Sequence, residues 1–98
     1  MRIEFHDDVL RRLAVEPLFV PAKWDRNLIK AYRKKIQLIQ AAEDERDLRA
    51  YRSLHLEQLQ ADRAGTSSIR LNDQLRLILT FKTDGVRVAV ILEVTDYH

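Results

Sequence analysis

The last three residues of the chain carry side chains that can transfer protons. Asp96, Tyr97 and His98 follow directly after the longest β-branched apolar run, residues 86–95. A histidine has an ordinary pKa of about 6.5, so a histidine held in place can act as a general base or a general acid. A strand ending at Thr95 would anchor this tail, whereas a terminal tail is ordinarily frayed. We therefore take His98 as the first candidate catalytic residue, with an uninformative tail as the alternative.

Several other chemistries have no counterpart in this sequence. The 98 residues include no cysteine, which excludes disulfides, thiolate nucleophiles and cysteine-ligated metal centres. No Walker-type loop, GxGxxG, HExxH or EF-hand pattern occurs, and two glycines are too few for a dinucleotide cradle. His6 beside Asp7 and Asp8 could hold a metal loosely, but the two aspartates also suit a helix N-cap. We expect no metal and no cofactor.

The hydrophobic pattern predicts an α+β domain with its helices first. Residues 2–5 alternate as a short strand, and Asp7-Asp8 caps a helix that ends before Pro17. Apolar residues recur at helical spacing from residue 24 to 42, and Asp44 caps a short helix to about Tyr51, with Tyr51 inward. Alternation with period two then predicts antiparallel strands at 68–71, 75–82 and 86–95.

The predicted strands give the sheet one apolar face and one mixed, partly basic face. Residues 75, 77, 79 and 81 are apolar, as are residues 86, 88, 90, 92 and 94, so we expect these two sets to share the core face. Arg76 and Arg87 then lie on the other face. An Asp-Gly turn at residues 84–85 favours a tight hairpin between the two longest strands.

Size and hydropathy bound the class of protein. A chain of 98 residues forms a single domain, residues 1–98, because two cores would each have about 50 residues. No apolar run approaches the roughly 18 residues that a membrane span needs. A signal peptide would be apolar near its start, where this chain has Arg2, Glu4, His6, Asp7 and Asp8. We expect a cytoplasmic protein that does not cross a membrane.

Positive charge is concentrated in one segment. The net charge of +2 is too small to indicate nucleic-acid binding, but residues 23–35 contain six basic side chains against one acidic one. In a helix, Arg26, Lys30, Arg33 and Lys34 face away from the apolar stripe. This segment is therefore a candidate binding surface or a solvated helix face.

Three blocks of the sequence resemble the HigB family of bacterial toxins, members of the RelE/ParE superfamily also called plasmid maintenance system killer proteins. The blocks are residues 62–65 (DRAG), residues 68–77 (SIRLNDQLRL) and the terminal Asp96-Tyr97-His98. The resemblance covers about residues 48–98 and implies a RelE-like α+β fold, in which N-terminal helices pack on a small antiparallel sheet. It also implies the toxin of a type II toxin-antitoxin system. Such a toxin is a ribosome-dependent endoribonuclease that cuts translated mRNA, and a helix-turn-helix antitoxin, HigA-like, neutralises it.

The resemblance also implies roles for individual residues. The reaction would be metal-independent: a 2′-hydroxyl attacks the adjacent phosphate while the protein moves protons and stabilises negative charge. Asp96, Tyr97 and His98 match the family's catalytic trio, and Arg76 matches the strand arginine that supports the scissile phosphate. Alternatively, Arg76 is a sheet-face charge paired with Glu93.

Four further positions carry weaker assignments. His55 resembles an upstream catalytic histidine, or else is a partly buried structural one. Arg63 and Arg70 lie in matching blocks, where they would contact phosphate or ribosomal RNA, or are plain surface arginines. Gln60 stands where family members often have a lysine, and because it cannot neutralise a phosphate, activity would be weaker.

The basic segment and the overall function keep alternatives open. Arg26, Lys30, Arg33 and Lys34 would grip ribosomal RNA, form the docking surface of the antitoxin, or be solvated. A ParE-like toxin that poisons gyrase, and a degenerate toxin that only binds its antitoxin, compete with the nuclease. The terminal Asp-Tyr-His favours the nuclease, and Gln60 weighs mildly against it.

Overall fold

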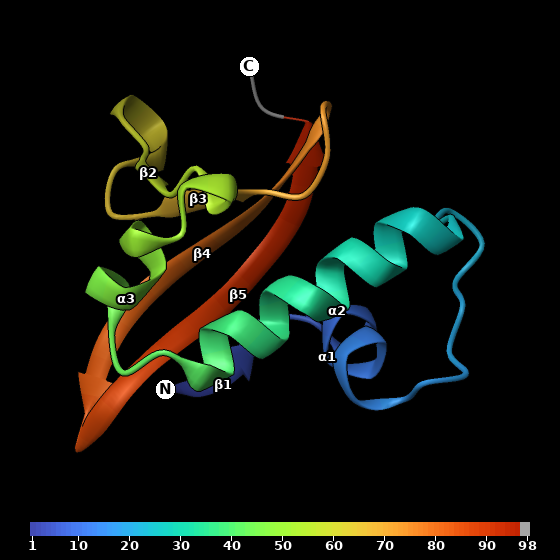
Figure 1. The fold of residues 1–98 in the computed structure, drawn as a ribbon, viewed down its shortest axis with the longest axis horizontal. Coiled ribbons are helices and arrows are strands. Elements are labelled where there is room, and N and C mark those ends of the chain that lie inside the picture. Colours follow the sequence, from blue (N-terminus) through green and yellow to red (C-terminus); the bar gives the residue numbers. More distant parts are fainter. Residues whose placement is uncertain (97–98) are drawn as a thin grey trace.

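The computed structural model describes residues 1–96. It has the predicted order of helices followed by strands, with a first short strand before the helices (Figure 1). Tyr97 and His98, two of the candidate catalytic residues, lie outside the described residues. The elements are β1 (Arg2–Phe5), α1 (Asp8–Val15), α2 (Arg26–Ala41), α3 (Glu45–Ala50), the 3₁₀ turn η1 (Arg52–Leu54), β2 (Glu57–Gln58), the 3₁₀ turn η2 (Ala61–Arg63), β3 (Ser67–Arg70), β4 (Leu75–Asp84) and β5 (Val86–Asp96).

Each of the three α-helices begins after an aspartate whose side chain accepts a main-chain N–H. Asp7 accepts from the N–H of residue 10 at 2.7 Å, Asp25 from that of residue 28 at 2.7 Å, and Asp44 from that of residue 46 at 2.9 Å. These bonds satisfy N–H groups that the first turn leaves without partners. The predicted caps at Asp7 and Asp44 are confirmed, and the long helix begins at Arg26 rather than at residue 24 because Asp25 caps it.

The five strands form one mixed sheet in the order β1-β5-β4-β3-β2. The pairs among β2, β3, β4 and β5 are antiparallel, as predicted. The expectation of a wholly antiparallel sheet was wrong for β1, which pairs parallel with β5 from Arg2 opposite Val88 to Phe5 opposite Ile91. A parallel pair needs a long crossover connection, and here the helices between β1 and β5 provide it.

A β-bulge in β5 changes which residues face the core. Ile78 of β4 lies opposite Glu93, but the next residue, Leu79, lies opposite Ile91, so Leu92 is the extra residue. An extra residue reverses the alternation of side chains along the strand. The core therefore takes Ala89 and Ile91, with Val94 packed against it. Of the predicted core positions on this strand, Val94 packs against the cluster and Val88 is fully buried outside it. The prediction was wrong for Val86, which is exposed, and for Val90 and Leu92, which are half-buried.

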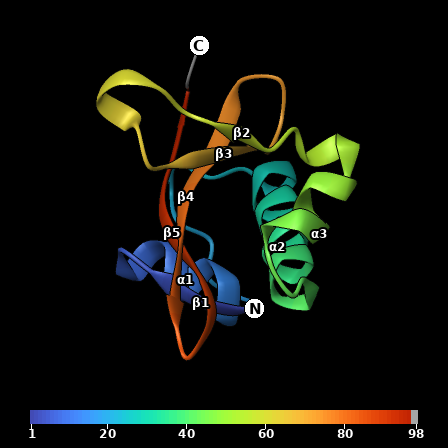
Figure 2. The same cartoon turned by 90° about the vertical axis from the view of Figure 1, so that its left-hand side faces the viewer.

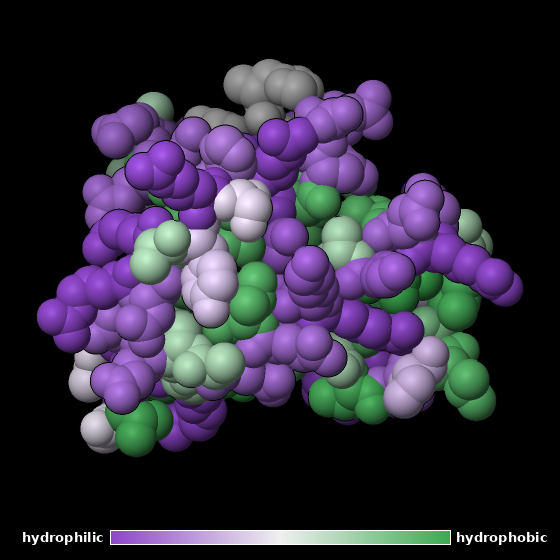
Figure 3. Space-filling view, in the orientation of Figure 1, coloured by the Kyte–Doolittle hydropathy of each residue, from purple (hydrophilic) through white to green (hydrophobic). Residues whose placement is uncertain are grey.

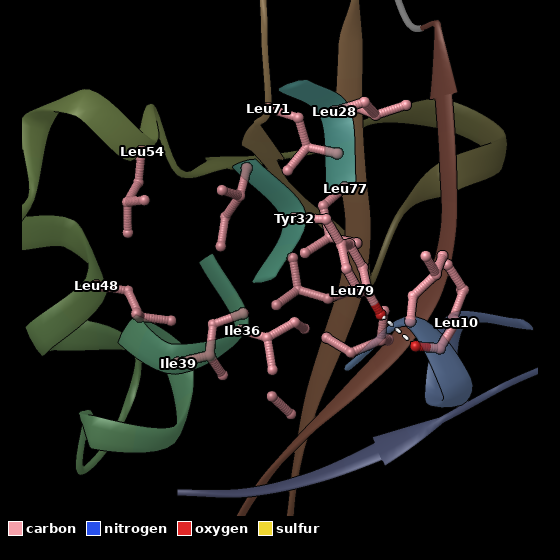
Figure 4. Close-up of a cluster of buried hydrophobic side chains, with 14 of the residues drawn as sticks. Leu10, Leu28, Tyr32, Ile36, Ile39, Leu48, Leu54, Leu71, Leu77 and Leu79 are labelled. Carbon is pink, nitrogen blue, oxygen red and sulfur yellow. Dashed lines mark hydrogen bonds between the residues drawn. The ribbon is translucent and has the colours of Figure 1, made fainter. Parts of the chain in front are cut away.

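The hydrophobic core lies between the sheet and the helices. Figure 2 shows α2 and α3 on one side of the strands, and Figure 4 shows leucine and isoleucine side chains from both layers meeting there. Tyr32 is fully buried among them, and its hydroxyl donates to the Leu10 carbonyl at 2.8 Å. Burial raises the pKa of the Tyr32 hydroxyl, so this group stays protonated and can donate its hydrogen bond.

Tyr51, at the end of α3, was predicted to face inward and does not. Tyr51 is 49% exposed, because α3 ends at Ala50 and the helical spacing stops there. Leu54 of η1 takes an inward position instead and is fully buried. Within residues 1–96, no helix combines the length and the apolar character needed to cross a membrane.

Candidate active site at one end of the sheet

Arg76 lies at the start of β4, on the sheet face opposite the one that packs on the helices. Its Nε donates to the Ser68 hydroxyl at 2.8 Å, and its Nη2 donates to the carbonyl oxygens of His55 at 2.6 Å and Ser68 at 3.5 Å. Ser68 is fully buried. The predicted alternative, a pair between Arg76 and Glu93, is contradicted, because the structure pairs Glu93 with Arg63.

The three hydrogen bonds fix the direction of the Arg76 guanidinium. Nε–H and both hydrogens of Nη2 are used by Ser68 and His55. A guanidinium has five N–H donors in a planar fork, so the Nη1 end remains to contact an anion. An arginine whose orientation is set before the ligand arrives can bind a phosphate without first losing its own side-chain freedom.

A second arginine faces the same surface from the neighbouring strand. Arg70 of β3 lies directly opposite Arg76 of β4 in the antiparallel register. Its Nε donates to the Asn72 carbonyl at 3.3 Å, and its Nη2 forms an ion pair with Asp73. Two like charges directly opposite each other are normally unfavourable in a sheet. Asp73 offsets part of the charge of Arg70 here, and the two guanidiniums give this face groups that can bind an anion.

A third arginine reaches this face from the loop that follows β2. Arg63 of η2 lies with its Nη1 3.5 Å from Glu93 of β5. The loop is held to the sheet by main-chain and side-chain bonds, including that from Thr80 Oγ1 to the Gly65 carbonyl at 2.8 Å. Gly65 has φ +87°, a left-handed conformation that a glycine adopts without strain. Arg63 thus approaches the strand face that also carries Arg76.

Two non-glycine residues near the site have left-handed backbones. Among the described residues only His55 (φ 47°) and Ala61 (φ 57°) do so, and Ala61 directly follows the exposed Gln60. Such conformations cost free energy and occur preferentially at binding and catalytic sites. His55 is exposed, not partly buried, and contacts Arg76 through its carbonyl oxygen.

Asp96 ends β5 beside the arginines. It lies opposite Leu75, one position from the pair formed by Arg76 and Thr95. Side chains alternate along a strand, so Asp96 points to the helix-side face and Arg76 to the other. Figure 1 shows that the C-terminal end of β5 and the turn between β3 and β4 lie at the same end of the sheet.

The basic helix face is separate from this arginine cluster. Arg26, Lys30 and Lys34 are exposed on α2, beside the segment 16–25 at the right of Figure 1. Arg33, predicted to face away from the protein, instead donates to the carbonyl oxygens of Leu13 at 2.8 Å, residue 16 at 3.0 Å and residue 19 at 3.4 Å. It ties the end of α1 to α2.

No three histidine, aspartate or glutamate side chains of residues 1–96 gather where they could hold a metal ion. Asp7, considered above as a loose ligand, caps α1, and Asp8 forms an ion pair with Arg11 at 2.8 Å.

Comparison with known proteins places the chain in a family. The sequence model described as "RelE-like toxin of type II toxin-antitoxin system HigB" matches residues 3–98. This chain belongs to the HigB-like toxin family. The match covers the N-terminal half as well, in which the sequence blocks offered no motif. No curated protein matches the sequence of this HigB-like toxin.

Solved structures of other toxins share the fold. A YoeB/ParE toxin from Agrobacterium tumefaciens has a TM-score of 0.62 at 13% identity, with 100% of both chains covered. The toxin-antitoxin complex RelBE2 from Mycobacterium tuberculosis matches with a TM-score of 0.55 at 20% identity, over 98% of this chain and 96% of that chain. At these identities the likeness shows the fold alone, and it confirms the RelE-like α+β architecture.

Sequence reasoning on this HigB-like toxin missed Ser68. The residue lies in a block that carried the resemblance, but it received no role. The available signal was a small hydroxyl residue at the start of an apolar strand, eight positions before an arginine on the same face. Its function as the acceptor for Arg76 Nε appears only when β3 and β4 are paired.

Proposed function

We propose that this HigB-like toxin is a ribosome-dependent endoribonuclease that cuts translated mRNA. RelE-like toxins are generally endoribonucleases, and the match to their family covers nearly the whole chain. The observation that carries the proposal is the opposition of Arg70 and Arg76 across β3 and β4, with Arg63 approaching the same face. Guanidinium groups bind phosphate oxygens in a bidentate way, so this face suits an RNA backbone.

In the proposed reaction a 2′-hydroxyl attacks the adjacent phosphate, and no metal takes part. The bond to the 5′-oxygen breaks as a 2′,3′-cyclic phosphate forms. Arg76 offers its Nη1 hydrogens to the phosphoryl oxygens, where negative charge grows in the transition state. Ser68 and His55 hold the Arg76 guanidinium in place before the substrate binds, so this side chain needs little movement during the reaction.

Proton transfer is assigned to the C-terminal residues. We propose His98 as general base or general acid, with Tyr97 and Asp96 as the other members of the trio. The position of the Asp96 main chain supports this, because β5 ends there at the same end of the sheet as Arg76, although the two side chains point to opposite faces. His55 is the alternative proton-transfer group, since its main chain contacts Arg76.

The proposal includes contacts and partners. The RNA backbone around the cut site contacts Arg63, Arg70 and Gln60. For the two arginines the positive charge matters more than precise geometry. The basic face of α2 has two candidate partners, ribosomal RNA and a protein. Because a related fold was solved as a toxin-antitoxin complex, we propose that a helix-turn-helix antitoxin, HigA-like, neutralises this toxin in the cytoplasm.

Induced expression in bacteria tests the proposal. We expect growth arrest that the antitoxin relieves, and primer extension should show new 5′ ends within translated messages. Cleavage by purified toxin on ribosomes already programmed with message should be unchanged by EDTA at a level that leaves the ribosomes intact. Arrest without cleavage, together with inhibited supercoiling by gyrase, would establish the ParE-like alternative. Normal growth with soluble expression would establish the degenerate toxin.

A further inference from the structure

A groove lined by apolar and basic side chains lies apart from the arginine cluster. It has a volume of about 620 Å³ and runs between residues 17–20 and α2. Pro17, Val20 and Ile29 supply apolar lining, and Lys30 and Lys34 border it from the exposed face of α2. In Figure 3 hydrophobic residues gather at the right-hand edge, over α1 and the segment that follows it, with hydrophilic side chains above them.

Val20 lines this groove, and Val15 and Leu18 line an adjoining hollow that shares Pro17 and Val20 with it. Leu18 is 95% exposed, Val20 62%, Val15 57% and Val9 43%. These four belong to a stretch of twelve residues, whereas only two other large hydrophobic residues of the described chain are exposed, Tyr51 and Val86. Clustered apolar exposure of this kind marks interaction sites. The proposed nuclease reaction makes no use of it.

The groove is formed before any partner arrives. Arg33 donates to the carbonyl oxygens of Leu13, residue 16 and residue 19, and so fixes the end of α1 and the segment that forms one wall to α2. Pro17 and Pro21 restrict the backbone on both sides of residues 18–20. A surface that is already ordered loses little conformational entropy on binding.

The side chains at the groove favour a protein partner over RNA. Single-stranded RNA is bound by stacking its bases on aromatic rings, but the residues that line this groove include no aromatic ring. The nearby rings already have partners within the protein. The Arg12 guanidinium lies 3.9 Å from the centre of the Phe19 ring, and Trp24 packs edge-on against Tyr32 at 5.4 Å. What remains exposed is aliphatic, and aliphatic groups bury favourably against other aliphatic groups.

Charge defines the partner further. Within residues 1–96 no carboxylate forms an ion pair with Arg26, Lys30 or Lys34, although many other arginines of the chain are paired. Three cations along an aliphatic groove are complementary to a helix that carries leucine-type residues on one face and carboxylates beside them.

We propose that this groove binds an acidic amphipathic helix of the antitoxin. The inference rests on the proposed function, which supplies the antitoxin as partner. Aliphatic side chains spaced three and four residues apart on that helix would enter between residues 17–20 and α2. Its carboxylates would face Arg26, Lys30 and Lys34. The antitoxin then holds the toxin by a surface that is separate from the arginine cluster.

The test measures the affinity of purified toxin variants for the proposed HigA-like antitoxin. One variant combines Leu18→Ser with Val20→Ser, and a second combines Lys30→Glu with Lys34→Glu. Val86→Ser is the control for the first, because Val86 is 54% exposed at the tip of the β4–β5 hairpin. Arg49→Glu on the exposed side of α3 is the control for the second. All changed side chains are exposed, so melting temperatures should equal that of the wild type.

We expect each groove variant to weaken antitoxin binding by about tenfold or more, while each control stays within about twofold. The effect of the charge variant should shrink at high salt, where screening is strong. The Leu18→Ser, Val20→Ser variant should retain ribosome-dependent cleavage.

Three results would overturn the inference. Unchanged antitoxin affinity with weaker ribosome binding in the charge variant would assign the groove to RNA. Unchanged antitoxin affinity with loss of self-association in the apolar variant would assign it to a second copy of this chain. Unchanged affinity with neither effect would leave the groove without the proposed role. A wild-type toxin that binds antitoxin through the groove but cuts no message would refute the nuclease proposal alone.

Discussion

Replacing Arg76 tests its two roles together, because it removes both the proposed phosphate contact and three hydrogen bonds within the protein. The guanidinium donates to the Ser68 hydroxyl at 2.8 Å and to the His55 carbonyl at 2.6 Å, with a longer contact to the Ser68 carbonyl at 3.5 Å. Hydrogen bonds from a charged group contribute about 1.5–3 kcal/mol each when buried. Arg76 is only half-buried, so water replaces part of this. We expect Arg76→Ala to lower the free energy of unfolding by about 1–2 kcal/mol.

The loss of cleavage should be larger than the loss of stability. Removing one donor that stabilises transition-state charge typically costs about 10²–10³-fold in rate, or about 3 kcal/mol. Ser68→Ala is the matched variant, since it keeps the guanidinium and removes only the acceptor for Nε. It should lose a similar amount of stability but only about tenfold in cleavage. Arg76→Lys keeps the charge but lacks the fork that reaches both Ser68 and His55, so its cleavage should resemble that of Arg76→Ala.

Two measurements together decide the outcome. Unfolding in urea gives the stability of each variant, and primer extension on programmed ribosomes gives the cleavage rate at a temperature where all variants are folded. Cleavage at the wild-type rate by folded Arg76→Ala would refute the phosphate role. Full activity of Arg76→Lys would show that charge alone suffices and that the orientation imposed by Ser68 and His55 is not needed.

Three further predictions test other parts of the molecule. A chain that ends at Tyr97 should lose about 10²–10⁴-fold in cleavage, the usual contribution of general acid–base catalysis, while its melting temperature and antitoxin binding stay unchanged; wild-type cleavage by this chain would move the assignment to His55. Tyr32→Phe should lower the free energy of unfolding by about 1 kcal/mol, because the Leu10 carbonyl loses its donor at 2.8 Å, and an unchanged urea midpoint would contradict this. The hydrogen bond from Arg87 lowers the pKa of the Glu45 carboxyl in the folded protein. The ion pair therefore contributes fully to stability above the pKa of the unfolded chain, about 4.5, and this contribution is lost as the pH falls through the lower pKa of the folded state. Melting temperatures of the wild type should therefore fall more steeply than those of Glu45→Gln below that pH, and parallel curves would show that the pair contributes nothing.

Local chemistry made the helices and most strands predictable. Asp7 and Asp44 mark helix starts because a capping bond involves only residues two or three positions along the chain. Alternation along β4 likewise predicted the core face of that strand, from Leu77 to Leu79. The sequence blocks also led to the toxin family, and to Arg76 as a residue of interest.

Features that depend on contacts between distant segments were not predictable in this way. The parallel pairing of β1 depends on where the helices return the chain, and the bulge at Leu92 depends on how β5 fits β4 over its whole length. Tyr51 was placed inward because helical spacing was assumed to continue past the end of α3.

The candidate site shows the same division. The sequence alone determined which side chains can bind phosphate or transfer protons, since that is a property of residue type. Only the tertiary structure decided that Arg76 donates to the Ser68 hydroxyl and the His55 carbonyl. It likewise decided that Glu93 pairs with Arg63 and that Arg33 connects α1 to α2. An arginine side chain is long and flexible, and the acceptors that fix it are main-chain and hydroxyl oxygens brought near by folding. The spacing of residues along the chain does not encode which of these oxygens will be in reach.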